Sequence, residues 1–206
     1  MLTHEQCVVW LRAFAALIDD NMEFLTDLDA AIGDADHGTN MARGATAALS
    51  KLGDTIPLGS MFKSVGMALV STVGGSAGPL YGTFFMKLGA KLGDVEDASL
   101  NTFAAALKAG RDGVVARGKA AVGEKTMIDA MTPAVEAFES HVADGPLVAA
   151  EAASAAAQQG RDATIPLVAK KGRASYLGER SAGHQDPGAT STAYLFEALV
   201  VAVKGG

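Results

Sequence analysis

The chain has 206 residues, 49% of them hydrophobic, with 17 basic and 23 acidic side chains and a formal net charge of −6. This acidic balance argues against a nucleic-acid-binding protein, which normally carries a basic face. A single cysteine, Cys7, excludes an internal disulfide. Since no signal peptide and no apolar run near the ~20 residues of a membrane span is visible, we expect a cytoplasmic protein with no membrane or nucleic-acid partner.

The predicted elements are all helices. Thr3 and Gln6 resemble a capping box, and apolar residues then recur at helical spacing as far as Leu25. Further helical patterns run near 40–52, 57–73, 80–92, 99–117, 127–142, 146–160 and 189–204, with a candidate short helix in 161–172. Asp186 followed by Pro187 predicts an N-cap and a first helical residue.

The predicted fold class is all-α. Alternation of period two is missing, and no linker divides the chain, so we expect no sheet and one domain over residues 1–206. About eight antiparallel helices joined by short loops predict a bundle or a closed helical barrel. A ligand site in such a fold lies where several interhelix loops meet at one end.

Three acidic residues, Asp29, Asp34 and Asp36, lie within one stretch of eight residues. Like charges this close repel one another unless a cation lies between them, and hard oxygen ligands suit Mg²⁺ or Ca²⁺. The spacing fails the EF-hand pattern, because Gly38 stands where the third ligand belongs and no Glu follows at the last position. We interpret the stretch as a magnesium–phosphate site; the alternative is a solvated acidic turn.

A glycine-rich segment over 73–82 is a second candidate, because its backbone N–H groups and Ser76 could face an anion at the start of a helix. On its own, this segment is better explained as an ordinary Gly-Pro turn. The stretch from Gly113 to Lys119 resembles a P-loop, but Ala120 replaces the required hydroxyl residue and no strand precedes it. Nearby Arg117, Lys119 and Lys125 remain candidates to line a phosphate site.

A long polar segment over 170–191 is a third candidate, since loops of this length in compact domains are often functional. Together with the earlier segments it resembles the DhaL family, the nucleotide-binding subunits of dihydroxyacetone kinase. The resemblance covers nearly the whole chain and lies in the motifs GDADHG (33–38), GGSAGPL (74–80), KTM (125–127), RASYLGER (173–180) and HQDPGATS (184–191). A departure is Glu124, where the family is expected to have Asp.

The resemblance implies an all-helical barrel with a nucleotide among the loops at one end. It implies Asp29, Asp34 and Asp36 as ligands of Mg²⁺, with two ions expected. The implied phosphate contacts are His37, Gly38, Thr39, Asn40, Ser76 and Ala77. The implied remainder of the ADP/ATP pocket is Gly118, Met127, Arg173, Asp186, Pro187 and Gly188. For Met127, base rates alone favour a core position.

The same resemblance implies a division of labour between proteins. ADP would act as a fixed coenzyme, rephosphorylated by a phosphohistidine protein of the phosphoenolpyruvate phosphotransferase system. Dihydroxyacetone, the resemblance implies, would be held covalently through a histidine of a separate kinase subunit. Of this chain's histidines, His4, His37, His141 and His184, only His37 and His184 lie in the motif segments, which the resemblance assigns to the nucleotide. Two alternatives stay open: the nucleotide subunit of an ATP-dependent kinase for a related ketose or sugar, and a regulatory module that binds a transcription regulator.

Overall fold

The computed structural model describes residues 1–53 and 56–205. All regular elements in this part of the chain are helices, and one isolated β-bridge joins Leu2 to Ala98. No helix in this part of the chain is both long and apolar enough to cross a membrane. The helices are α1 (His4–Asp20), α2 (Met22–Ile32), α3 (His37–Leu49), α4 (Leu58–Thr72), α5 (Ala77–Leu92), α6 (Leu100–Gly118), α7 (Met127–Ser140), η1 (Val142–Asp144), α8 (Pro146–Ala163), η2 (Arg173–Ser181) and α9 (Pro187–Lys204).

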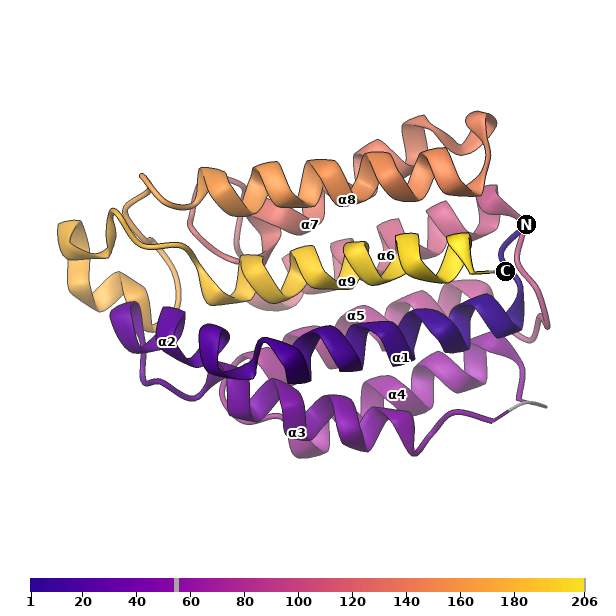
Figure 1. Ribbon diagram of the computed structural model, residues 1–206, viewed down its shortest axis with the longest axis horizontal. Coiled ribbons are helices and arrows are strands. Elements are labelled where there is room, and N and C mark those ends of the chain that lie inside the picture. Colours follow the sequence, from indigo (N-terminus) through magenta and orange to yellow (C-terminus); the bar gives the residue numbers. More distant parts are fainter. Residues whose placement is uncertain (54–55, 206) are drawn as a thin grey trace.

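Eight of these helices close into a ring. Contacts run from α1 to α3, then in chain order from α3 to α9, and from α9 back to α1. Neighbours in the ring point in opposite directions, so both termini lie at one end and α2 lies at the other (Figure 1). The predicted all-α fold, an antiparallel barrel of about eight helices, is confirmed.

Aromatic side chains fill the middle of the barrel. Trp10 of α1 lies against Phe62, Phe85 and Phe103, with ring centroids 5.6–6.1 Å apart. Its indole N–H donates to the carbonyl oxygen of Leu195 on α9 at 2.7 Å. Since burial of large apolar side chains is the main driving force of folding, this cluster stabilises the ring from within.

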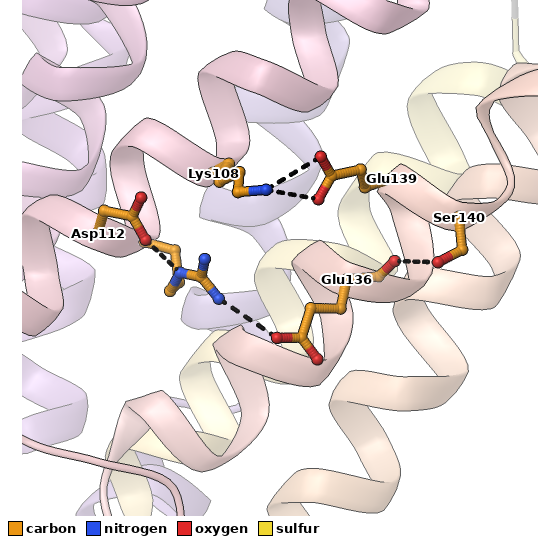
Figure 2. A network of polar contacts seen from close by, with 6 residues as sticks. Lys108, Asp112, Glu136, Glu139 and Ser140 are labelled. Carbon is orange, nitrogen blue, oxygen red and sulfur yellow. Dashed lines mark hydrogen bonds and ion pairs between the residues drawn. The ribbon is translucent and has the colours of Figure 1, made fainter.

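Helices α4 and α5 approach closely because glycines line their contact. A methyl group on Gly66 would lie 2.7 Å from the carbonyl oxygen of Gly82, and one on Gly89 would lie 2.6 Å from that of Gly59. Helices α6 and α7 are joined instead by surface ion pairs, Lys108 with Glu139 at 3.1 Å and Arg111 with Glu136 at 3.6 Å (Figure 2). Exposed pairs of this kind contribute little, so the apolar contacts beneath them carry this interface.

Most of the predicted helix ends are confirmed, and two predictions are wrong. Thr3 forms a capping box with Gln6, and Asp186 caps α9 by accepting from the N–H of Ala189 at 2.7 Å. The first helix does not continue to Leu25: it ends at Asp20, because the Asn21 side chain donates to a carbonyl of the last turn.

The second error concerns 161–172, where α8 ends at Ala163 and no separate helix forms. Pro166 disfavours helical backbone at Ile165, and the carbonyl group of Ile165 accepts from Lys125 and from the distant N–H of Gly183 instead of from a following turn. Helical turns appear later, as η2, inside the segment predicted to be a polar loop.

Candidate functional site

The end of the barrel opposite the termini contains a pocket of about 470 Å³. Because the ring is antiparallel, α3, α5, α7 and α9 all begin at this end, and their first residues line the pocket. The N-terminus of a helix carries unpaired N–H groups and a partial positive charge. Four such ends around one pocket favour a ligand with several negative charges.

Three carboxylates lie together on one side of the pocket. Asp29, Asp34 and Asp36 each offer an oxygen within 4.8 Å of the other two. Two oxygens on opposite sides of a magnesium ion lie about 4.2 Å apart, since Mg–O bonds are about 2.1 Å long. The predicted ligand set is therefore brought together at a spacing that fits a hard divalent cation.

Asp29 lies in α2 rather than in the loop, and its carboxylate accepts two backbone hydrogen bonds. Its Oδ2 atom accepts from the N–H of Asp36 at 2.8 Å and from that of His37 at 3.2 Å, which satisfies donors at the start of α3. The backbone between the acids turns through Ala35, whose φ of 60° is rare for a side chain larger than glycine. This turn aims Asp34 and Asp36 back toward Asp29.

A cation from a distant part of the sequence reaches the acidic cluster. Arg173, the first residue of η2, pairs with Asp34 at 2.9 Å. Below this ion pair, Ile32, Ala169 and Ala174 form a small apolar cluster that attaches η2 to α2. The ion pair is exposed to solvent, so it orients Arg173 more than it stabilises the fold.

His37 connects the acidic cluster to the base of the pocket. Its Nε2 atom lies 2.9 Å from the Ser191 hydroxyl, which lies 2.8 Å from the hydroxyl of the buried Tyr81. Burial lowers the pKa of His37, although the negative charges of Asp29 and Asp36 oppose this shift. Burial therefore favours the neutral imidazole at this position.

The opposite wall of the pocket is apolar. Leu80, Val114, Met127 and Ile128 line it, together with Pro187 at the start of α9. Beside this wall, burial raises the pKa of Asp186 to about 7, and the N–H of Ala189 and the charge of Lys125 oppose the shift. A pocket with a carboxylate cluster on one side and apolar side chains on the other suits a ligand with a charged end and a flat hydrophobic end.

All but two of the positions implied by the sequence line this one pocket. The exceptions are Gly38 and Thr39, in the first turn of α3. Gly38 faces α2, where a methyl group would lie 2.5 Å from the Thr26 hydroxyl, so its role here is close packing. Thr39 is exposed, and its hydroxyl donates to the carbonyl oxygen of Asp36 at 3.0 Å.

Some pocket residues were missed or misjudged from the sequence. Tyr81 and Val114 carry helical core spacing, and nothing local distinguishes them from other core residues. Lys125 was a candidate phosphate contact, but its ammonium donates to backbone carbonyl groups of Thr164, Ile165 and His184. Lys119 does not line the pocket, whereas Arg117 does.

The sequence of the chain is similar to those of known proteins. Residues 31–201 match the DAK2 domain. The chain is 43% identical to the PEP-dependent dihydroxyacetone kinase, ADP-binding subunit DhaL of Escherichia coli (strain K12), over 98% of this chain and 99% of that protein. It is 45% identical to the PEP-dependent dihydroxyacetone kinase 1, ADP-binding subunit DhaL of Listeria innocua, over 93% of this chain and 92% of that protein.

A solved structure has the same fold. The dihydroxyacetone kinase from C. freundii in complex with AMP-PNP and Mg²⁺ superposes with a TM-score of 0.73 at 31% identity, over 96% of this chain. The alignment covers only 33% of that kinase, so the present chain spans about a third of its length.

Proposed function

The chain belongs to the DAK2 domain family, within its DhaL group, and from this membership we propose that it is the nucleotide-binding subunit of a dihydroxyacetone kinase. The observation that carries the proposal is a pocket lined by three clustered carboxylates, by the first residues of four helices and by an apolar wall. The relatives that match over nearly their full length are named ADP-binding subunits, and the structural relative is described as a complex with a nucleotide analogue and Mg²⁺.

The proposal divides the pocket into three parts. Asp29, Asp34 and Asp36 hold two Mg²⁺ ions, which neutralise phosphate oxygens when bound. Donors at the starts of α3 and α5 contact the phosphates, together with Arg173; those that line the pocket are His37, Asn40, Ser76 and Ala77, while Gly38 and Thr39 complete the first turn of α3. The base lies beside Gly118, Met127 and the Asp186–Gly188 turn, so the terminal phosphate points toward the acidic cluster.

The chemistry asked of this chain is positioning and charge compensation. In phosphoryl transfer, charge spreads over the oxygens of the moving group, and preorganised donors stabilise it without reorganising. The N–H groups at the starts of α3 and α5 are fixed by their helices, and Arg173 supplies a guanidinium at the mouth of the pocket. No side chain of this chain needs to form a covalent intermediate.

We further propose the reaction partners and location that the DhaL group implies. The chain forms one domain, works in the cytoplasm, and transfers the phosphoryl group to dihydroxyacetone that a separate kinase subunit holds. A phosphohistidine protein of the phosphoenolpyruvate phosphotransferase system then rephosphorylates the bound ADP. These proposals rest on the names of the full-length relatives, PEP-dependent in both cases, and on the partial coverage of the longer kinase.

The test is magnesium-dependent binding of ADP to protein that has been stripped of nucleotide. At a hundredfold excess over Kd, a ligand that binds only the folded state stabilises it by about 2.7 kcal/mol. Mg–ADP should therefore raise the melting temperature, a chelator should reverse the rise, and a phosphohistidine donor should convert the bound ADP to ATP. Equal melting curves with and without Mg–ADP would reject the nucleotide site.

A further inference from the structure

Lys125 is the one cation with a buried side chain in the part of the chain that the structure describes, with 1% of its surface exposed. A buried ammonium group is unfavourable unless its charge and its donors are compensated. Burial accordingly lowers the pKa of Lys125, and the negative charges of Asp186 and Asp129 act against this shift. A buried ammonium group in the wall of a pocket indicates that the residue has a specific structural or functional role.

Its contacts join three separate segments. The Nζ atom donates to the carbonyl oxygen of Thr164 at 2.7 Å, to that of Ile165 at 3.4 Å, and to that of His184. An ammonium group has three N–H donors, so these carbonyl groups use all of them. The first two acceptors follow α8, the third precedes α9, and Lys125 itself precedes α7.

The segments that Lys125 joins are also bonded to one another. The Thr164 hydroxyl accepts from the N–H of Asp186 at 3.0 Å, and the Ile165 carbonyl accepts from that of Gly183 at 2.8 Å. Asp186 in turn caps α9. The start of α9 therefore depends on Thr164 and Ile165, which the lysine holds.

The backbone at Lys125 supports the same conclusion. Its φ is 63°, in the left-handed region that non-glycine residues rarely adopt. Among the residues that the structure describes, the other non-glycine residues with positive φ are Ala35, between α2 and α3, and Lys119, in the same α6–α7 connection as Lys125. Strained backbone persists where surrounding contacts impose it, and it gathers at functional sites.

We propose that Lys125 is a positioning residue: its buried ammonium group holds the start of α7 against the start of α9 and so sets the width of the pocket between Met127 and the Asp186–Gly188 turn. The lysine acts on the nucleotide through these neighbours and not by contact with phosphate. This role in binding rests on the proposed nucleotide function, whereas the link between the two helix starts does not.

The test uses Lys125→Met, which roughly keeps the length of the side chain but removes the ammonium group that joins the carbonyl groups of Thr164, Ile165 and His184. In nucleotide-free protein, hydrogen exchange should become faster at the amides of 164–165 and 183–186 and stay unchanged in α4 and α5. Calorimetry should show Mg–ADP binding weakened about tenfold or more, the loss expected for hydrogen bonds to a charged group.

Two further variants separate positioning from general loss of stability. Trp10→Phe removes the buried indole donor to Leu195 in the middle of the barrel, and should lower stability while leaving Mg–ADP affinity within about twofold. Thr164→Val keeps the lysine but removes the hydroxyl that accepts from the backbone N–H of Asp186. This variant should also weaken Mg–ADP binding, as Lys125→Met does. If Lys125→Met does not fold, Thr164→Val decides.

The proposal is overturned if exchange near 164 and 183 is unchanged, or if affinity falls only as much as in Trp10→Phe at equal loss of stability. Exchange in Lys125→Met and Thr164→Val is measured without nucleotide. A wild-type protein that binds no Mg–ADP would therefore refute the proposed function, while the exchange data would still test the link that Lys125 makes.

Discussion

The acidic cluster shows how single residues combine structural and chemical roles. Asp29 satisfies two N–H groups at the start of α3, and Asp34 pairs with Arg173. Asp36 makes no side-chain capping bond to the helix that follows it. Its carboxylate is thus the member of the cluster that can change with least effect on the fold.

Asp36→Asn should therefore weaken Mg–ADP binding by about a hundredfold, because it replaces a charged oxygen ligand by a neutral amide. Phosphoryl transfer should be lost with it, while circular dichroism and melting of the metal-free protein stay close to wild type. Asp27→Asn is the matched control, since Asp27 lies exposed on α2. Unchanged magnesium dependence in Asp36→Asn would remove Asp36 from the metal site.

Asp186 predicts a pH dependence of stability. Burial raises its pKa from 3.8 to about 7, so between these values the folded state holds a proton that the unfolded state has released. The stability it contributes is present in full below pH 3.8 and is lost as pH rises through about 7. Asp186→Asn retains a good N-cap residue but cannot titrate.

In metal-free protein, the free energy of unfolding of wild type relative to Asp186→Asn should fall as pH rises from 5 to 8, by at most about 1.4 kcal/mol per pH unit. Denaturant titrations at several pH values measure this difference. The comparison cancels His37, whose lowered pKa acts in the opposite direction below its ordinary value of 6.5. A difference that does not vary with pH would contradict the raised pKa.

The helices of the ring differ in how they meet. Helix α1 contacts its neighbours through large aromatic side chains, α6 and α7 add surface ion pairs, and α4 and α5 approach through glycine. The last contact is the least adaptable, because backbone atoms rather than flexible side chains stand opposite each other.

Gly66→Ala should lower the free energy of unfolding by up to about 2 kcal/mol. The added methyl group meets the Gly82 carbonyl, and overpacking of about 1–3 kcal/mol outweighs the gain of about 1 kcal/mol in helix propensity. Chemical denaturation measures the change. Met67→Ala, at an exposed position of the same helix, should change stability by no more than about 0.5 kcal/mol. A stabilised Gly66→Ala protein would show that the two helices can separate without loss.

The barrel as a whole has two different ends. At the end that carries the termini, Leu2 pairs with Ala98. The backbone N–H of His4 donates to the Asp97 carboxylate there, and its ring contacts the Ile56 carbonyl oxygen. At the other end, four helix starts, α2 and η2 surround the pocket. The alternating direction of the helices is what collects the anion-binding groups at one place.

With MgATP alone, the 206-residue chain should phosphorylate dihydroxyacetone at no useful rate, because the proposed function leaves the sugar to a partner subunit. Adding the cognate sugar-binding subunit should restore transfer, and docking of that subunit would also exclude water from the phosphate. A coupled kinase assay with and without the partner measures this. Robust turnover by the carefully purified chain would point to a kinase that needs no partner.

Local patterns in the sequence predict most of the helices, the capping box at Thr3 and the acidic stretch, because 3.6-residue periodicity and side-chain capping act over a few residues. Family resemblance adds the placement of the binding motifs. The break at Asn21 and the irregular 164–172 segment were missed, since each depends on a side chain competing for backbone groups.

Only the tertiary structure decides which distant groups meet. His37 reaches Ser191 across 154 positions of the chain, and Lys125 reaches His184 across 59. Such contacts leave no periodic trace, because the residues between them carry no information about where the ring closes. The sequence contains a lysine beside a nucleotide motif, and the closed barrel determines that its charge is buried against three carbonyl groups instead of facing a phosphate.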